Sequence, residues 1–424
     1  MTMNVNTQPQ PGSLFGVPTQ TVREFFLPES NGNSVTTTLN SGSSISANLE
    51  QYDQTAIIRA HAFYINLAMT FTAGTSETLT QSQLFPYNVI SSFQVKFQSA
   101  FSTMDLSGIM AFVMQSYRPS LAKKTGPMVA SNLGVASSQY STITTEQTST
   151  NLAVSSGVSD ATASINLVLE SPESIKFDKY WELDNLGRPL VTNQGMLPAL
   201  RNIIVSPEYM SGLTRIITPT LQFNQLLGVN NTLNAPVSKA AADTTSTATG
   251  TATISTYKIG WYQGNEAAMP AKITPWRYAR NQFSVPVSTG NPIINLANDN
   301  AGQGQILSLV IYTYDPTLNT GTGGIVPFSD YATVELVVGS EFLLRKDTIA
   351  TMQYKWLEQH GTLPWAGMIM YDLAINDVGE FTNENAINTL NTAGCQVRIT
   401  YASGYVPASG SQIFVGVEAL KWVS

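Results

Sequence analysis

Histidine side chains carry much enzyme chemistry, and this chain of 424 residues has only two of them. His61 lies near the start of an alternating segment, and His360 lies at the end of a helical pattern beside Gly361. Catalysis of the Ser-His-Asp type needs a histidine base within reach of a nucleophile. A histidine at a helix C-terminus interacts favourably with the helix dipole when it is protonated. We therefore expect both histidines to be structural.

The single cysteine, Cys395, excludes a disulfide framework within the chain. It precedes a segment in which apolar and polar residues alternate, so we expect a small buried side chain rather than a nucleophile. One cysteine and two histidines are also too few for the usual transition-metal sites. The sequence thus predicts no catalytic residue, no metal site and no cofactor.

Carboxylates give two further candidates. Asp299 lies between Asn298 and Asn300, and oxygens of these side chains are calcium ligands. One carboxylate without the spacing of an EF-hand loop favours a turn of the Asn/Asp/Gly kind instead.

A glycosidase pair is the second candidate that the carboxylates offer. Glu170, Glu173 and Asp178 lie close together in the sequence. Nothing in the sequence sets the separation of their carboxyl groups, which decides whether such a pair can act. A β-sandwich glycan hydrolase or lyase is therefore the third of three hypotheses that we carry.

Charge is scarce throughout the chain. The 21 Lys and Arg and 28 Asp and Glu make up 12% of the residues, against about 25% in ordinary soluble domains. The net charge of −7 excludes a nucleic-acid binder that works through a basic face, and the low charge content excludes a strongly charged disordered chain. We expect the basic pair Lys123-Lys124 to be solvated surface. Interface cores are depleted in charged residues, so we predict that much of the polar surface lies in contacts between copies.

The sequence predicts neither a transmembrane helix nor a signal peptide. No run of about 18 apolar residues occurs, so no transmembrane helix is expected. Residues 1–22 contain no Lys or Arg and no apolar core segment, so they do not have the pattern of a signal peptide.

Strict alternation of apolar and polar residues is the dominant pattern. In Phe63–Thr72 every odd position is large and apolar, which predicts a half-buried strand because alternate side chains of a strand lie on opposite faces. Ile306–Tyr314 is apolar on both faces, as in a strand between two layers. Further segments alternate in the same way: Phe93–Phe97, Ala163–Leu169, Leu221–Phe223, Val397–Tyr401 and Ile413–Ala419. Many strands separated by turns predict β-sandwiches.

Two segments show helical spacing instead. Met104–Tyr117 is predicted as a helix, with Ser102 and Asp105 as its capping box. Thr348–Gln359 is predicted as the second helix, with Asp347 as N-cap and Gly361 at the C-terminal end.

The two helices stand in matching contexts, since each follows a long strand, a second strand and a short link. The blocks lie about 240 residues apart, which indicates a duplicated domain rather than a solenoid of short repeats. We expect long loops at Leu121–Ser159, Asn230–Thr251 and Asp315–Ser329. The expected organisation is an arm over 1–22, a first domain over 23–265 and a second over 266–424.

Two consecutive β-sandwiches with one inserted helix each resemble the double jelly-roll major capsid proteins of the tectivirus, corticovirus and adenovirus lineage. The resemblance covers Arg23–Ser424 and rests on pattern and order, without an invariant motif. Its local parallels are Phe63–Phe71 followed by Phe85–Ile90, the exit Ser171-Pro172, Arg215–Phe223 followed by Asn224, the closing strand Thr253–Tyr262 and the opening strand Tyr278–Val285. The fold it implies is all-β, a double jelly roll with one short helix inserted in each roll.

The resemblance also implies a function. Such proteins form homotrimers of pseudo-hexagonal outline that build an icosahedral virion shell, here expected to be that of a bacteriophage, with penton and minor capsid proteins as further partners. They occur in the virion and, during assembly, in the host cytoplasm. The N-terminal arm would lie toward an internal viral membrane where one exists, which makes Leu14, Phe15 and Val17 candidate assembly residues. No direct binding of nucleic acid is implied.

Aromatic residues leave a second hypothesis open, a β-sandwich spike or adhesin that binds a receptor or a carbohydrate. Exposed tryptophans could stack on sugars, whereas buried ones would pack in cores and subunit interfaces. Trp422, two residues from the end of the chain, is a candidate contact between rolls or subunits. The other five tryptophans are Trp181, Trp261, Trp276, Trp356 and Trp365.

Overall fold

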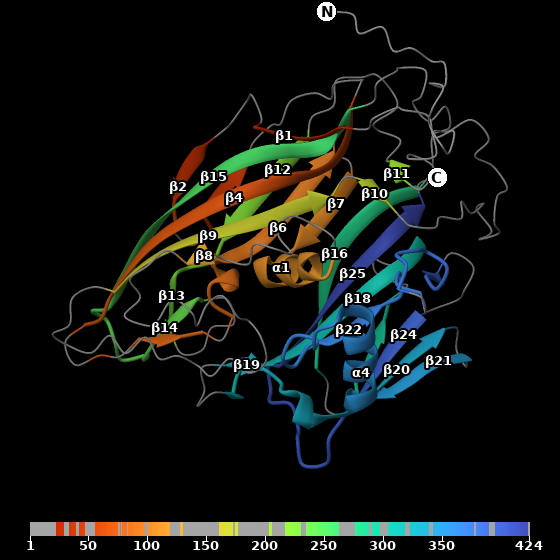
Figure 1. Cartoon of the computed structure of the whole chain (residues 1–424). Helices are drawn as coiled ribbons and strands as arrows, with labels where there is room; N and C mark the ends of the chain where they lie inside the picture. Colours follow the sequence, from red (N-terminus) through yellow and green to blue (C-terminus); the bar gives the residue numbers. More distant parts are fainter. Residues whose placement is uncertain are drawn as a thin grey trace, which may run out of the picture.

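The computed structural model describes twelve stretches of the chain, several of them with short internal breaks of one to four residues. These stretches are 23–28, 34–39, 42–46, 56–118, 128–129, 161–176, 203–205, 217–229, 235–262, 276–296, 304–389 and 395–422. Within them the fold is dominated by β-strands, arranged as two sandwiches that lie side by side (Figure 1). We call these sandwiches the first roll and the second roll.

A six-stranded sheet forms the outer layer of the first roll. Its order is β1-β15-β4-β9-β8, and β2 also pairs with β15. The strands are β1 (Arg23–Pro28), β15 (Thr247–Tyr262), β4 (Ala56–Thr72), β9 (Ala161–Pro172), β8 (Met128–Val129) and β2 (Val35–Thr38). The odd residues of Phe63–Phe71 are at most 2% exposed, so the predicted alternation of this strand is confirmed.

A ten-stranded sheet runs through both rolls, in the order β19-β18-β25-β16-β7-β6-β12-β3 with β22 and β23 on β18. The part in the first roll contains β3 (Ser44–Ser46), β12 (Ile217–Phe223), β6 (Ile90–Phe97) and β7 (Phe101–Leu106). The part in the second roll contains β16 (Trp276–Pro286), β25 (Gln412–Trp422), β18 (Gly304–Asp315), β19 (Gly324–Ile325), β22 (Ile369–Asp372) and β23 (Ile387–Asn388). A parallel pairing of β7 with β16 joins the two parts.

A four-stranded sheet, β17-β24-β20-β21, closes the second roll. Its strands are β17 (Ile293–Asn295), β24 (Cys395–Tyr401), β20 (Tyr331–Val338) and β21 (Phe342–Thr348). The smaller elements are β5 (Thr80–Gln81), β10 (Ser174–Lys176), β11 (Ile203–Val205), β13 (Leu227–Val229), β14 (Val237–Lys239) and the 3-10 turns Tyr87–Val89 and Phe328–Asp330. The strands predicted by alternation all lie inside strands of the structure.

The first helix, α1 (Gly108–Ser116), starts four residues later than predicted. Phe101–Leu106 is the strand β7, because it pairs with β6 from Phe97 to Phe93. The N-cap is Ser107, whose hydroxyl accepts a hydrogen bond from the backbone N–H of Met110, so the predicted capping box of Ser102 and Asp105 is wrong. The Asp105 carboxylate instead accepts from the Gln94 side chain across the strand pair.

The second helix, α4 (Ile349–His360), lies one residue from its predicted bounds, and its N-cap is Thr348 rather than Asp347. Asp347 is still in β21, where its buried carboxylate lies 2.5 Å from Arg345 Nε and 3.1 Å from Lys355 Nζ. Gly361 ends the helix at a φ of 68°, the left-handed conformation that favours glycine. Among the described residues, neither α1 nor α4 is long and apolar enough to cross a bilayer.

The two rolls repeat each other strand for strand. Each roll has eight strands with an equivalent in the other roll, and these can be counted from one to eight along the chain. In both rolls one sheet has the order one, eight, three, six, and the facing sheet has the order two, seven, four, five. In both rolls the helix follows strand five. The equivalent elements are β1 and β16, β15 and β25, β4 and β18, β9 and β22, β3 and β17, β12 and β24, β6 and β20, β7 and β21, and α1 and α4. The predicted duplication is thus present in the topology, and its short links are the strands β7 and β21.

Two apolar cores lie inside the rolls, and β18 contributes to both. Leu309 and Ile311 belong to the core of the second roll, while Val310 and Tyr312 belong to the core that contains α1 and the first roll. All twelve residues of β18 are buried, as predicted for a strand between two layers. The predicted domain boundary near 265 falls between β15 and β16, in residues outside the described part of the chain.

Part of the loop expected at Asn230–Thr251 is regular structure. It contains β14 and the first five residues of β15, where Thr247 pairs with Thr72 of β4. The Ser/Thr-rich composition suggested a loop, but alternating threonines suit a strand whose outer face is polar. Asp243 makes the preceding turn, accepting hydrogen bonds of 2.9 Å from the backbone N–H groups of Thr245 and Ser246. The loops expected at Leu121–Ser159 and Asp315–Ser329 contain the short strands β8 and β19 respectively.

Candidate functional site at the junction of the two rolls

Helix α1 occupies the space between the two rolls. Eight of its nine residues are buried, and its side chains meet β25 of the second roll at Gly416. A Cβ at Gly416 would lie 2.4 Å from Met110 Sδ, so any larger residue at this position would have to displace the Met110 side chain. The apolar sequence of α1 is therefore explained by neighbours on all sides.

Polar contacts at the start of α1 also reach the second roll. Both the backbone N–H and the hydroxyl of Ser107 donate to the side-chain oxygen of Gln282 in β16, at 2.9 and 2.8 Å. From the second roll, Trp365 follows α4, and its ring packs edge-on against Phe112 of α1 at 5.5 Å. Its indole N–H donates to the Ser116 hydroxyl at 3.3 Å. The junction is thus specified by directional contacts as well as by apolar packing.

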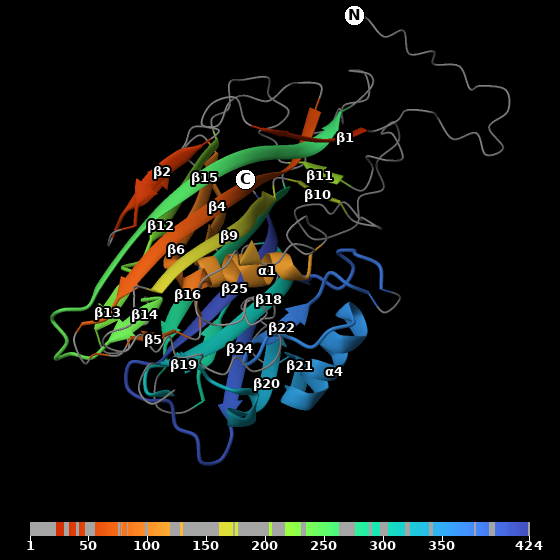
Figure 2. The ribbon, with the colours of Figure 1, turned by 60° about the vertical axis from the view of Figure 1, so that its left-hand side comes forward.

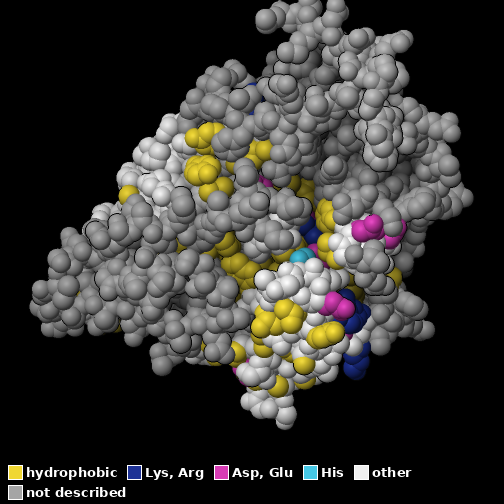
Figure 3. All heavy atoms as spheres, viewed as in Figure 1, with side chains coloured by type: hydrophobic (Ala, Val, Ile, Leu, Met, Phe, Trp, Pro, Cys, Tyr) yellow, Lys and Arg dark blue, Asp and Glu magenta, His cyan; other side chains and the backbone are white. Residues whose placement is uncertain are grey.

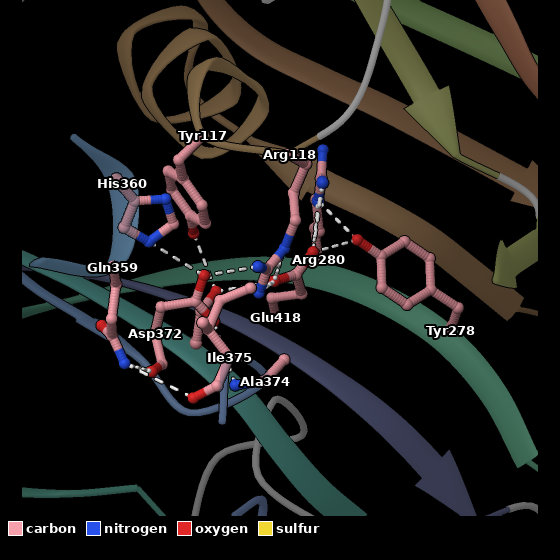
Figure 4. Close-up of polar contacts among 11 residues, drawn as sticks. Tyr117, Arg118, Tyr278, Arg280, Gln359, His360, Asp372, Ala374, Ile375 and Glu418 are labelled. Atoms are coloured by element: carbon pink, nitrogen blue, oxygen red, sulfur yellow. Dashed lines mark hydrogen bonds and ion pairs between the residues drawn. The ribbon is translucent and has the colours of Figure 1, made fainter. Parts of the chain in front are cut away.

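Directly after α1, Arg118 forms ion pairs with two carboxylates of the second roll (Figure 4). Its Nε donates to Glu418 Oε2 of β25 at 2.8 Å, and its Nη2 makes a further short contact with the same oxygen. Its Nη1 lies 2.6 Å from Asp372 Oδ2 at the end of β22. All three side chains are at most 5% exposed.

Glu418 binds three more polar side chains besides Arg118. Arg280 Nη2 lies 3.1 Å from Glu418 Oε1, and the Tyr278 hydroxyl donates to the same oxygen through a short hydrogen bond. The Ser308 hydroxyl donates to Glu418 Oε2 at 2.7 Å and lies 2.7 Å from the Tyr117 hydroxyl. Both carboxylate oxygens are therefore fully used, as a buried carboxylate requires.

Asp372 is held from the side of α4. His360, the last residue of α4, places Nε2 3.1 Å from Asp372 Oδ2, and the backbone N–H of Ala374 donates to Oδ1 at 3.0 Å. The Gln359 amide donates to the backbone carbonyls of Asp372 and Ile375. The ends of both helices thus meet at one cluster, which we call the junction cluster: Arg118, Arg280, Asp372, Glu418 and their polar neighbours Tyr117, Tyr278, Ser308 and His360.

The electrostatics of the junction cluster keep its carboxylates ionised. Burial by itself raises the pKa of Glu418, but the charges of Arg118 and Arg280 and the hydrogen bonds from Arg118 and Tyr278 outweigh burial and lower the pKa to about 2. Burial likewise opposes ionisation of Asp372, and Arg118 with the His360 contact lowers its pKa below the usual value. Two arginines face two carboxylates, so the cluster is close to neutral.

This arrangement suits the positioning of two rolls and does not suit catalysis. The carboxylates are closed off from solvent and have all their oxygens engaged, so they offer no group to a substrate. Separating the rolls would leave Arg118 charged and unpaired, Asp372 without its arginine and Glu418 with Arg280 alone, and an unpaired charge is costly in a buried site. No group of three or more His, Cys, Asp or Glu that could hold a metal ion occurs in the described part of the chain.

The expected burial of Cys395 is confirmed, and the structural role of the two histidines stays a prediction. His61 is 1% exposed in β4. His360 stacks on Trp356 at 4.1 Å. Burial raises the pKa of the Cys395 thiol to about 12. Both Trp356 and Trp365 pack against other aromatic rings rather than forming an open platform for sugars.

The roles of the other candidate residues stay predictions, and the structure describes only some of these residues. Glu170 is buried in β9, where its backbone N–H donates to the Gln115 side chain at 2.9 Å. Trp422 is the last residue of β25 and pairs in register with Trp276 of β16. The remaining candidates lie outside the described residues: Leu14, Phe15, Val17, Lys123, Lys124, Glu173, Asp178, Trp181 and Asp299.

The junction cluster itself was not predicted from the sequence. A signal existed for Glu418, because it lies between Val417 and Ala419 in an apolar strand, and charged residues are almost never fully buried unless they are paired. The pairing of the partners could not be read from the sequence, since Arg118 and Glu418 are 300 positions apart.

Comparisons with known proteins bear on the fold. No family model matches the chain, and no curated protein matches it either. Among solved structures, the crystal structure of the major capsid protein of STIV matches with a TM-score of 0.51 and 12% identity, covering 94% of this chain and 97% of that one. The atomic structure of Sulfolobus turreted icosahedral virus contains a chain with a TM-score of 0.52 and 11% identity, with coverage of 94% and 91%. The chain therefore has the double jelly-roll fold of these viral major capsid proteins.

Proposed function

We propose that this protein is a major capsid protein that assembles as homotrimers of pseudo-hexagonal outline into an icosahedral virion shell. The observation that carries the proposal is the strand-for-strand repeat of two rolls, held side by side by a buried junction. Three chains with two equivalent rolls each supply six equivalent units, which is what a pseudo-hexagonal capsomer needs. The fold shared with the STIV major capsid protein supports the same conclusion.

The low charge content of the chain and the burial of its described candidate residues agree with a structural role. Charged residues are 12% of the chain, and interface cores are depleted in charge. Of the described catalytic candidates, His61 and Glu170 are buried, and the side chain of His360 is 6% exposed. We infer that the protein acts through self-association and not as an enzyme.

The remaining expectations extend this proposal to the virion. The partners would be copies of the same chain, penton and minor capsid proteins and, through the arm with Leu14, Phe15 and Val17, an internal membrane where the virus has one. The location would be the virion shell, reached from the host cytoplasm. A bacterial host, the absence of direct nucleic-acid contacts and the interface role of Trp422 also remain predictions.

Purified protein tests the proposal directly. Sedimentation velocity and native mass spectrometry should give a mass of three chains, and negative-stain electron microscopy should show particles of pseudo-hexagonal outline. A protein that remains monomeric over the whole accessible concentration range, including under conditions that favour capsid assembly, would contradict it.

A further inference from the structure

The equivalent helices of the two rolls have different surroundings. In α1 eight of nine residues are buried, whereas in α4 only three of twelve are buried, namely Ile349, Met352 and Trp356. The partner of α1 is the neighbouring roll of the same chain. Within one described chain, the outer face of α4 has no neighbouring roll.

The outer face of α4 nonetheless carries large apolar side chains, among exposed polar residues such as Thr351 and Glu358. Tyr354 is 65% exposed and Leu357 41% exposed, and they lie three residues apart on one side of the helix. Leu363, just after the helix, is 47% exposed. Figure 3 shows hydrophobic side chains on the surface of the lower part of the molecule, where α4 lies. We call this surface the α4 patch.

The edge strand beside α4 is also unpaired on one side. In the first roll, β7 pairs with β16 at the edge of the second roll. Its equivalent β21 is the last strand of its sheet, with β20 as its partner among the described strands. The second roll therefore exposes the helix and the strand edge with which the first roll binds its neighbour.

The first roll exposes the surface that would receive them. In the second roll, the outward residues of β18, such as Val310 and Tyr312, are buried in the core that contains α1. The equivalent residues of β4, namely Tyr64, Asn66 and Ala68, are exposed. Thr249 and Thr251 of the adjacent β15 are exposed as well.

No charged residue interrupts this face of the first roll. Residues 62–72 of β4 and 247–257 of β15 contain no Asp, Glu, Lys or Arg. A flat sheet face made of threonine, serine, asparagine and tyrosine can be covered without the desolvation cost of buried ions. We call this surface the β4–β15 face.

The α4 patch and the β4–β15 face lie at opposite ends of the molecule in both ribbon views (Figures 1 and 2). Two different surfaces at opposite ends cannot satisfy each other within one chain, so they suit a head-to-tail contact between chains. The α4 patch is also continuous with the junction, because the buried side of α4 places the Trp356 ring 5.1 Å from that of Tyr117.

We infer that the α4 patch and the edge of β21 in one copy dock on the β4–β15 face and the edge strand β1 of the next copy. This contact repeats between chains the junction that α1 and β7 make within a chain. It rests on the proposed capsomer and names its interface. Because each chain then adds two equivalent steps to a ring, three copies close it.

Charge substitution on the α4 patch tests this interface. Tyr354→Glu and Leu357→Glu, alone and combined, place carboxylates in the contact while leaving the buried side of α4 unchanged. The variants should stay folded by circular dichroism but become monomeric. Because an unpaired charge is costly to bury, the dissociation constant of the trimer should rise by at least about 100-fold. The matched control is Val406→Glu, on a loop residue that is 74% exposed outside both surfaces, and it should stay trimeric.

Cross-linking with milder substitutions tests the partner surface. Leu357→Cys protein mixed with Ala68→Cys protein should give a covalent dimer with a flexible bismaleimide reagent. Leu357→Cys alone should give none, because a head-to-tail contact does not bring two copies of α4 together. The native Cys395 is buried and does not compete.

The outcomes separate the two proposals. A trimeric wild type whose trimer survives the glutamate substitutions, with no link between positions 357 and 68, overturns the interface and leaves the capsomer proposal standing. Links within Leu357→Cys protein alone would point to a two-fold contact and overturn the interface too. A wild type that is monomeric throughout overturns both.

Discussion

Arg118 and Glu418 are 300 residues apart in the sequence, yet Arg118 Nε lies 2.8 Å from Glu418 Oε2 in a site closed to solvent. One residue follows the helix of the first roll, and the other lies in the last strand of the second roll. The pair therefore links the two repeats through a buried ion pair. Its behaviour on mutation and on acidification gives two predictions.

Removing the arginine should destabilise the whole chain. Arg118→Met leaves Asp372 without its arginine and Glu418 with Arg280 alone, and breaking a buried ion pair from one side costs about 3–5 kcal/mol. Urea unfolding should show this loss. The control is Lys346→Met, which removes the partially exposed pair with Glu335 at 2.7 Å and should cost less than about 1 kcal/mol. Equal losses in the two variants would show that the cluster does not hold the rolls together.

Acid should weaken the junction in a defined pH range. The pKa of Glu418 is lowered from 4.5 to about 2 in the folded protein. A lowered folded pKa means that its stabilisation is present above about pH 4.5 and is lost as the pH falls toward 2, by about 3 kcal/mol in all. Asp372, whose pKa is also lowered, acts in the same direction.

The pH dependence can be assigned with a single variant. The free energy of unfolding of the wild type, measured in urea between pH 7 and pH 2.5, should fall across this range. Glu418→Gln should be less stable at pH 7 and should show a smaller fall. Parallel curves for the two proteins would mean that other carboxylates carry the acid sensitivity.

The sequence was sufficient for the strands because alternation is a local property. Phe63–Phe71 and Ile306–Tyr314 form the predicted strands with the predicted faces buried. The duplication was also visible, since each repeat contains its own strands and helix. The two short links before the helices are the strands β7 and β21. Their sequences alone could not show this, because a short apolar segment fits a strand as well as a helix.

The predictions that failed depended on contacts that periodicity does not encode. Met104 and Leu106 fit both helical spacing and strand alternation, and pairing with β6 decides for the strand. Asp347 has a good capping side chain, but Arg345 and Lys355 bind its carboxylate and Thr348 caps the helix. The junction cluster joins residues at the ends of α1 and α4 with four strands, β16, β18, β22 and β25, so no local pattern could have assembled it.

Gly416 gives a test of how closely α1 packs on β25. Gly416→Val should destabilise the protein by about 1–3 kcal/mol through overpacking, because its side chain would overlap Met110. Combining it with Met110→Ala should recover part of this loss by making room. Thermal unfolding of the two single variants and the double variant measures the coupling. Additive losses would show that the two residues do not share this space.

Cys395 should be inert in the folded protein. Its side chain is buried in the second core, and burial raises the pKa of its thiol from 9.0 to about 12. Since the thiolate is the reactive form, only about one molecule in 10,000 carries it at pH 8. Ellman's reagent should therefore leave the native wild type unmodified and label one thiol per chain after unfolding in guanidinium. Val406→Cys, at an exposed loop position, is the control and should add one thiol that reacts at once in the native protein. Rapid labelling of the native wild type would mean that β24 opens to solvent and that the second core is less closed than its burial indicates.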